Sequence, residues 1–171
     1  MQTERLLLRA PVPDDVGAIF ERYAADPDVT RYLSWPRHTS LDDTRAFIEF
    51  SDAEWPKWKT GPLLVFSRAD GVLLGGTGLL FETPYRAATG YVFARDAWGK
   101  GYATEALRAM TELAGSMGVR RLSALCHVQH RASWRVMEKC GFEREGILKR
   151  HTVFPNLSPE PEDVLSYSRI F

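Results

Sequence analysis

The stretch from residue 91 to residue 117 constrains the fold of this chain more than any other. Residues 91–93 have the character of a strand end, and a loop containing Gly99 and Gly101 follows. From Ala103 to Met117, apolar residues recur at the i, i+3, i+4 and i+7 spacing of an amphipathic helix. A strand that leads through a short loop into a helix is typical of a mixed α/β protein.

The rest of the pattern fits one twisted sheet with helices on both of its faces. Strands are expected at Leu6–Leu8, Leu63–Ser67, Val72–Leu80, Thr89–Phe93, Arg121–His127, Gly146–Val153 and Val164–Ile170. Helices are expected from Asp14 or Asp15 to Tyr23, from Ser40 onward, and over Ala103–Met117 and Ser133–Cys140. Ser40 and Asp43 form a capping-box pattern, and the prolines that follow Trp55 are expected to break the chain. Residues 1–171 are therefore predicted to form a single domain.

Charge and composition exclude several classes of partner. The 22 Lys and Arg residues balance the 22 Asp and Glu residues, which argues against bulk electrostatic binding to nucleic acid or to an anionic membrane. No run approaches the roughly 20 apolar residues of a membrane span, so a cytoplasmic protein is expected. The two cysteines, Cys126 and Cys140, show no disulfide framework. His127 and His130 have no third ligand nearby, so no metal is expected.

The glycine loop before the helix at Ala103 is suited to an anion. Gly99 and Gly101 let the backbone approach a ligand closely and adopt positive φ. The first turn of the helix adds unpaired N–H groups and the positive end of the helix dipole, which together favour phosphate or pyrophosphate. The loop lacks the pattern of a P-loop or of a dinucleotide fold. Taken alone, it could equally be a plain tight turn before a helix.

Four segments, in order along the chain, resemble the GNAT N-acetyltransferase superfamily, in the branch of the ribosomal-protein N-terminal acetyltransferases. The segments are Thr3–Arg9, Trp98–Ala106, His130–Phe142 and Asp163–Ser168. The family binds acetyl-CoA with a Q/R-x-x-G-x-G/A loop, and here Gly101 and Ala103 match that loop while Trp98 replaces its Gln or Arg. The resemblance covers essentially the whole chain.

This resemblance implies a particular fold and cofactor. The fold would be a mostly antiparallel sheet of six to seven strands with a splayed strand that binds acetyl-CoA. A backbone N–H within Val92–Ala94 would stabilise the thioester oxygen, and the pyrophosphate would lie on Gly99–Thr104. His130 replaces an Asn that contacts pantetheine in the family. The cofactor-binding residues implied are Val92, Phe93, Ala94, Trp98, Gly99, Lys100, Gly101, Tyr102, Ala103, Thr104, His130 and Ser133.

The resemblance also implies direct attack of an amine on acetyl-CoA, which needs a base and a partner for the leaving thiolate. Glu82 is the best-placed carboxylate for the base, with an ordinary surface glutamate as the alternative. Glu105 is a poorer choice because it lies in the first turn of the cofactor helix. Many relatives use a tyrosine for the thiolate, but that position is Met137 here, so Ser133 is expected to substitute.

The acceptor is less specified by the sequence. Tyr32, Trp35 and Tyr85 are candidates to line an amine or peptide groove, and core packing is the alternative for these aromatic residues. A protein N-terminus and a small-molecule amine are both compatible with the pattern, as is a homodimer. A second class of function is an acyl-CoA-binding regulatory module that has lost turnover.

Overall fold

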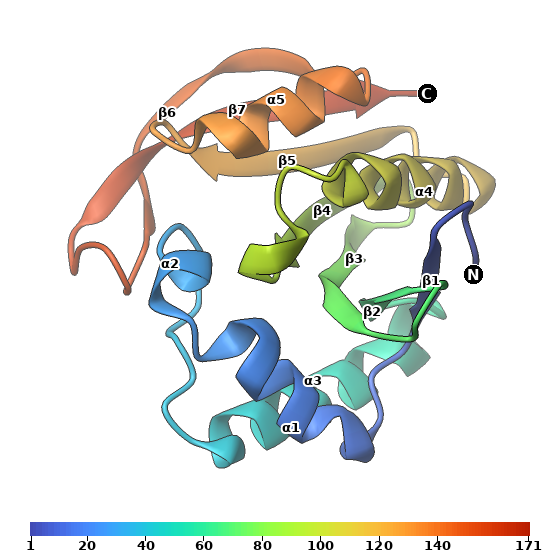
Figure 1. The fold of residues 1–171 in the computed structure, drawn as a ribbon. Helices are drawn as coiled ribbons and strands as arrows, with labels where there is room; N and C mark the ends of the chain where they lie inside the picture. The colour runs from blue at the N-terminus through green and yellow to red at the C-terminus, as the bar shows by residue number, and fades with distance from the viewer.

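The computed structural model describes residues 1–171 and contains one seven-stranded sheet (Figure 1). The strand order is β1-β2-β3-β4-β5-β7-β6, and every neighbouring pair is antiparallel except β4 with β5. The strands are β1 Leu6–Arg9, β2 Pro62–Ser67, β3 Leu73–Thr83, β4 Arg86–Phe93, β5 Arg121–His127, β6 Glu143–Val153 and β7 Pro161–Ile170. The predicted mixed α/β fold with a mostly antiparallel sheet is confirmed.

Helices cover both faces of the sheet, as the sequence predicts (Figure 1). The helices are α1 Val16–Ile19, α2 Pro27–Thr30, α3 Leu41–Trp58, α4 Tyr102–Ser116 and α5 Arg131–Lys139, with short 3-10 turns at Pro13–Asp15 and Arg95–Ala97 and a π turn at Phe20–Ala24. Figure 1 shows α4 and α5 together on one side of the sheet and α1 and α3 on the other. None of these helices is both long and apolar enough to span a membrane.

The predicted capping box at Ser40 is confirmed, whereas the predicted cap by Asp14 or Asp15 is wrong because neither side chain caps α1, and two predicted helices need correction. Ser40 caps α3, since its hydroxyl accepts from Asp43 N–H while the Asp43 carboxylate accepts from the Ser40 backbone. The first correction is that α3 continues through Pro56 to Trp58. Trp58 stacks on Phe81 of β3 with ring centroids 5.0 Å apart, so tertiary packing outweighs the hydrogen bond that the proline removes.

The second correction concerns the predicted first helix. The segment from Pro13 to Ala24 passes through 3-10, α and π geometry instead of forming one regular α-helix. Ile19, Tyr23 and Ala24 are nevertheless buried, so the predicted apolar face does pack against the sheet. The helix α5 begins at Arg131, two residues before the predicted start.

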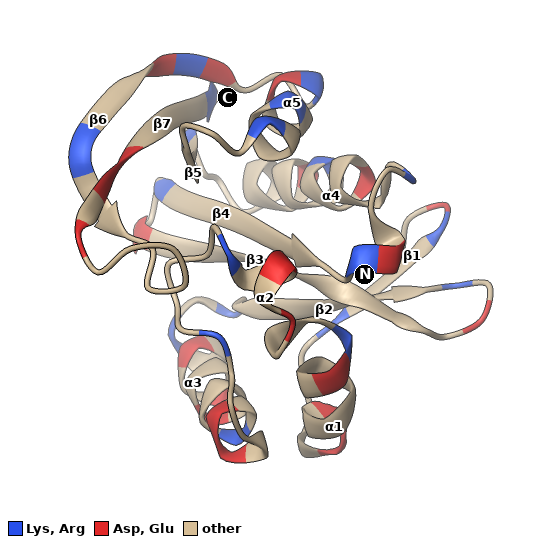
Figure 2. Cartoon of the chain, turned by 60° about the vertical axis from the view of Figure 1, so that its left-hand side comes forward, with Lys and Arg blue, Asp and Glu red and all other residues tan.

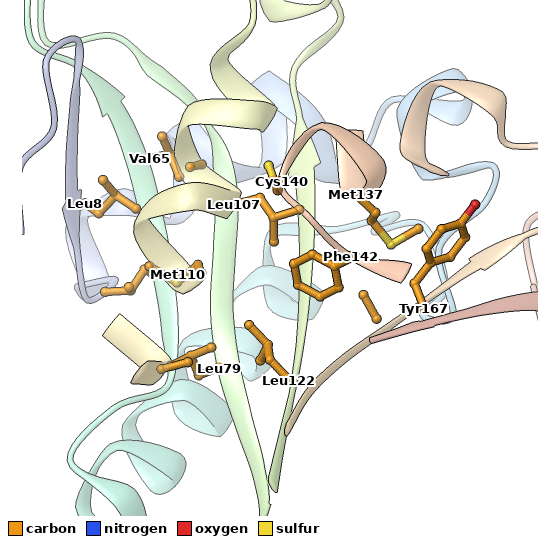
Figure 3. Packing of buried hydrophobic residues seen from close by; sticks show 14 of the residues in the cluster. Leu8, Val65, Leu79, Leu107, Met110, Leu122, Met137, Cys140, Phe142 and Tyr167 are labelled. Atoms are coloured by element: carbon orange, nitrogen blue, oxygen red, sulfur yellow. The ribbon is translucent and has the colours of Figure 1, made fainter. Parts of the chain in front are cut away.

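The main core lies between the sheet and the layer of α4 and α5. Leu107 and Met110 of α4 and Met137 of α5 are fully or almost fully buried there. Figure 3 shows the Phe142 ring between the side chains of α4 and Met137, directly after the turn that ends α5. This packing fixes α4 and α5 relative to the strands whose ends they follow.

The parallel pair β4 and β5 stays together for only three residue pairs. The pairs are Arg86 with Arg121, Ala87 with Leu122, and Ala88 with Ser123. Beyond them, β4 continues beside β3 as far as Phe93, and β5 continues beside β7 as far as His127. The two strands therefore diverge toward their C-terminal ends, which confirms the predicted splayed strand.

Candidate active site

The split between β4 and β5 leaves one edge of β4 without a strand partner. On the other edge, two side-chain bonds reinforce the pairing of β4 with β3, because Thr77 Oγ1 donates to the Gly90 carbonyl and Thr89 Oγ1 donates to the Gly78 carbonyl, both at 2.8 Å. Gly75 of β3 leaves room for β4, since a Cβ there would lie 2.1 Å from the Val92 carbonyl oxygen. The pairing with β3 therefore fixes the position of β4 and of its free edge.

Phe93 presents its backbone to the split. Ala94 N–H donates to the Leu74 carbonyl at 2.8 Å, so Ala94 faces β3. Backbone groups of successive strand residues point to opposite edges, so Val92 also faces β3 and Phe93 faces away from it. The indole Nε1 of Trp98 donates to the Phe93 carbonyl at 2.7 Å, which fits this orientation. Of the three predicted backbone positions, Phe93 is therefore the one whose N–H faces the split.

The loop that follows has the conformation expected of an anion cradle. Gly99 and Gly101 have φ of 71° and 82°, in the region that favours glycine. Gly101 is the N-cap of α4, and no side chain caps the helix there. The N–H groups of Tyr102, Ala103 and Thr104 have no partner within the helix, because an α-helix leaves its first turn unpaired. The structure therefore brings the predicted loop residues into one exposed, donor-rich turn.

The N-terminal segment clamps this turn to the sheet. Glu105 accepts hydrogen bonds from Thr3 Oγ1 at 2.5 Å, from Arg5 N–H at 2.9 Å and from Arg5 Nε at 2.7 Å. Arg5 also donates to the Lys100 carbonyl at 3.0 Å and lies over the Tyr102 ring. Partial burial raises the pKa of Glu105, but these hydrogen bonds outweigh it and hold the pKa below its usual value. Glu105 is thus an ionised positioning residue.

Ser133, in the first turn of α5, is held by a residue on β4. Tyr91 Oη donates to the Ser133 carbonyl at 2.8 Å and lies 3.1 Å from Ser133 Oγ. Burial raises the pKa of Tyr91, which keeps its hydroxyl protonated at neutral pH. This contact joins the two walls of the split.

Neither cysteine has the character of a nucleophile. Both are buried, and burial raises the pKa of Cys126 to about 11 and also raises that of Cys140. Met137 is buried in the core and offers no hydroxyl (Figure 3). The hydroxyl groups that the structure places at the split are those of Ser133 and Tyr91.

An aromatic stack closes the end of β5. The Tyr32 ring stacks on His127 at 4.8 Å and on His130 at 4.9 Å between centroids. His127 Nδ1 accepts from Gln129 N–H at 3.1 Å, so its proton is on Nε2 in the neutral form. Burial lowers the pKa of both histidines. No group of three or more His, Cys, Asp or Glu side chains is arranged to hold a metal ion.

Trp35 belongs to a loop that Asn156 holds in place, a contact that the sequence does not predict. Asn156, in the loop between β6 and β7, donates to the carbonyls of Thr30 and Trp35 at 2.8 and 2.9 Å and accepts from Arg37 N–H at 2.7 Å. Two loops far apart in the sequence are thereby fixed to each other. Tyr32 and Trp35, both predicted to contact substrate, belong to one of these loops.

Glu82 and Tyr85 lie elsewhere. Both belong to the β3–β4 hairpin at the N-terminal end of β4, where β4 and β5 are still paired. Glu82 forms an exposed ion pair with Arg86 at 2.8 Å. The carbonyl of Tyr85 accepts from Arg120 and Arg121 N–H. The structure therefore does not bring either residue together with Ser133, because the length of β4 separates the hairpin from the open end of the split.

Sequence reasoning missed two residues that shape the site, Tyr91 and Asn156. The signal for Tyr91 was its place two residues before Phe93, since strand residues two apart share a face and Phe93 points into the core below α4. Asn156 follows Pro155 in a loop and carried no pattern that would link it to Trp35.

Comparison with known proteins assigns this arrangement to a family. Residues 5–143 match the model of the acetyltransferase (GNAT) domain. The N-acetyltransferase YoaA of Bacillus subtilis, itself uncharacterized, is 29% identical over 97% of this chain and 94% of its own length. The acetyltransferase of the GNAT family from Bacillus anthracis superposes with a TM-score of 0.86 at 29% identity, covering 99% of this chain and 96% of that one.

A structure with bound cofactor is also similar. The ribosomal L7/L12 alpha-N-protein acetyltransferase RimL, in complex with coenzyme A, superposes with a TM-score of 0.87 at 25% identity, covering 99% of this chain and 96% of that one. The matched domain spans most of the sequence, including the split strand and the loop at α4. This chain therefore belongs to the GNAT family of acetyltransferases.

Proposed function

We propose that this protein transfers an acetyl group from acetyl-CoA to a primary amine by direct attack within a ternary complex. The observation that carries the proposal is the split between β4 and β5, which leads from the free N–H of Phe93 into the uncapped N-terminus of α4. In acetyl-CoA a long flexible arm joins a thioester to a pyrophosphate. The thioester would lie at Phe93 N–H, and the pyrophosphate would lie at the N-terminus of α4. A pantetheine arm can pair with the free edge of β4 much as an added peptide strand would.

The pyrophosphate would lie on residues 99–104. The positive φ of Gly99 and Gly101 turns the backbone so that a ligand can approach without meeting a Cβ. The N–H groups of Tyr102, Ala103 and Thr104, together with the helix dipole, supply the positive potential. Lys100 is exposed in the same loop and adds a positive charge. A chain without net charge can hold a polyanionic cofactor in this way.

Phe93 N–H would stabilise the oxygen of the thioester as the amine attacks. That oxygen gains negative charge in the transition state, and a fixed donor in a site shielded from water stabilises it strongly. Trp98 keeps Phe93 oriented through its bond to the carbonyl. His130, the N-cap of α5, stacks on Tyr32 beyond the end of β5 and would contact the pantetheine arm.

Ser133 would serve the leaving thiolate. As the new bond between nitrogen and the acetyl carbon forms, the bond between carbon and sulfur breaks and the sulfur takes a proton. Tyr91 gives its hydrogen to the Ser133 carbonyl, so the Ser133 hydroxyl donates to Tyr91 Oη, 3.1 Å away, before the reaction. To serve the thiolate, the Ser133 hydroxyl would turn from Tyr91 to the sulfur, give up its proton there and regain one from water. Tyr91 thereby acts as a positioning residue for Ser133.

The proton of the attacking ammonium group would leave through water and not through Glu82. Glu82 pairs with Arg86 at the closed end of the split, away from Phe93. The open end is bordered by His130 and Tyr32, and burial keeps His130 neutral by lowering its pKa. A neutral imidazole can accept a proton from a water chain at neutral pH.

The acceptor would be a protein N-terminus or a small-molecule amine that enters beside Tyr32 and Trp35. The name of the similar RimL protein, which acts on ribosomal L7/L12, supports the first of these. A regulatory module that binds acetyl-CoA without turnover is the competing function, because Met137 replaces the tyrosine that many relatives use.

A thiol-release assay separates the two functions. The protein is given acetyl-CoA and, in separate reactions, peptides with different N-terminal residues, diamines and polyamines, and the free thiol is followed with a colorimetric reagent. An enzyme releases thiol only when an accepted amine is present, and mass spectrometry finds one acetyl group on that amine. Tight acetyl-CoA binding without acceptor-dependent release across the panel would identify a regulatory module.

A further inference from the structure

A pocket of about 290 Å³ lies between α4 and the C-terminal end of α5, outside the split described above. Its walls carry three cations, Arg108, Lys139 and Arg169, and a single carboxylate, Glu112. This is a marked local excess in a chain whose charges balance overall. Figure 2 shows Lys and Arg on the neighbouring stretches of α4 and α5. The pocket therefore has the charge of an anion site.

Two of the three cations, Arg108 and Lys139, have no carboxylate partner, and the third has a structural role. Arg169 donates to the Cys140 carbonyl at 2.6 Å and so satisfies the C-terminus of α5. Arg108 and Lys139 are exposed, and neither forms an ion pair with a carboxylate. The neighbouring pocket of about 500 Å³ differs in this respect, because Glu145 there pairs with Arg121.

The pocket adjoins the predicted pyrophosphate cradle. Cys140, one of its lining residues, places Sγ 3.4 Å from the Thr104 carbonyl in the first turn of α4. Arg108 follows Thr104 by four residues, about one turn or 6 Å along the helix axis, and so lies on the same face of α4. A ligand with phosphates on residues 99–104 could place a further phosphate beside Arg108 without crossing another element.

We propose that Arg108 and Lys139 bind the 3′-phosphate of the ribose of coenzyme A. This rests on the function proposed above, since it extends the same cofactor from the cradle into the adjoining pocket. A phosphate monoester carries close to two negative charges at neutral pH, and guanidinium and ammonium groups are its usual partners. The site distinguishes coenzyme A from dephospho-coenzyme A, which has the same thiol arm and pyrophosphate but lacks this one group.

The test compares the Kd of coenzyme A and of dephospho-coenzyme A by isothermal titration calorimetry. The proteins are the wild type, the double variant Arg108→Gln/Lys139→Gln, and, as a control, Arg120→Gln, which removes an exposed cation beyond the C-terminal end of α4 and outside the pocket. We expect the wild type and the control to bind coenzyme A about tenfold more tightly than the dephospho form, the scale of one or two partly exposed charge-assisted contacts. In the double variant this ratio falls close to one, while the Kd of the dephospho form stays unchanged.

The outcomes separate the two proposals. If the wild type binds both ligands equally, the phosphate site is refuted and the cofactor cradle stands. If the wild type binds neither ligand, the proposed function fails together with the phosphate site. If the double variant weakens both ligands by the same factor while its circular dichroism spectrum and Tm match the wild type, Arg108 and Lys139 do not recognise the 3′-phosphate.

Discussion

Replacing Glu105 with glutamine tests whether this residue positions the turn proposed to bind the cofactor or acts as the base that transfers a proton. The Glu105 side chain is 17% exposed and accepts three hydrogen bonds, two of them on Oε1 and one from Arg5 Nε on Oε2. Glutamine keeps one accepting oxygen but loses the charge and places an NH₂ group toward Arg5. Because Arg5 is 44% exposed, its ion pair contributes only about 0.5–1 kcal/mol.

The two bonds to Oε1 lose their charge assistance, and the new amide NH₂ is left facing the Arg5 Nε donor. Allowing for both effects, we expect E105Q to reduce the free energy of unfolding by about 2 kcal/mol. The measurement is urea denaturation followed by circular dichroism, with Glu49→Gln as the control. Glu49 is an exposed residue of α3 without an ion pair, so its replacement should change stability by less than about 0.5 kcal/mol.

The stability effect of E105Q should also depend on pH. The folded-state pKa of Glu105 lies below its ordinary value, so the ionised carboxylate stabilises the fold at neutral pH. That contribution is complete above the ordinary pKa of about 4.5 and is lost as the pH falls from there through the folded-state pKa. The difference between wild type and E105Q should therefore shrink in that acidic window.

Turnover decides the role of Glu105. As a positioning residue, it should affect kcat by less than about threefold when changed to glutamine, with the larger effect on the KM for acetyl-CoA. Loss of kcat by a factor of about 100 or more, in a folded variant with unchanged cofactor affinity, would instead make Glu105 the base and refute this reasoning.

Three further predictions follow from the same geometry. Ser133→Ala should lower kcat by about 100-fold with little change in acetyl-CoA affinity, and Tyr91→Phe should lower kcat by about tenfold, because the hydroxyl that orients Ser133 is gone. Equal turnover of either variant and the wild type would remove that residue from the mechanism. Gly75→Ala should destabilise the fold by about 2–3 kcal/mol in urea denaturation, since its Cβ would meet the β4 backbone, whereas Gly90→Ala has open space and should cost less than about 1 kcal/mol. The pKa of His127 is below 6.5 in the fold, so the unfolded chain binds more protons at mildly acidic pH, and stability should fall as the pH drops from about 6.5 toward the folded-state pKa. His127→Asn should flatten this slope in unfolding measurements across that range, and an unchanged slope would count against a neutral buried imidazole.

The turns and caps were predictable because their causes are local. Ser40 and Asp43 form their capping box within four residues of each other. Gly99 and Gly101 adopt the positive φ expected of a glycine loop that leads into a helix. The split of β4 from β5 was predictable for a different reason, since it came from resemblance to a family and not from the local pattern.

The side-chain partners around the site were less predictable, because they join residues far apart in the sequence. Tyr91 and Ser133 are 42 residues apart, and Glu105 meets Arg5 across 100 residues. The position of Glu82 after the third strand suggested a base, but the length of the hairpin, which extends β3 to Thr83, determines that it lies at the closed end. Helix α3 continues through Pro56 because packing of Trp58 outweighs a local signal.

The affinity of acetyl-CoA for two matched glycine variants tests the central claim most directly. Gly101 and Gly118 have φ of 82° and 80°, one at the N-terminus of α4 and the other just after its C-terminus. The positive φ strains an aspartate similarly at both sites, and its Cβ would lie 3.4 Å from Arg5 Nη2 at Gly101 but in open space at Gly118. Only at Gly101 would the added carboxylate lie in the turn proposed to hold the pyrophosphate. We predict that Gly101→Asp weakens acetyl-CoA binding at least about 100-fold in calorimetry, while Gly118→Asp stays within about twofold of the wild type. Equal, wild-type affinity in both folded variants would contradict the assignment of the cofactor to this turn.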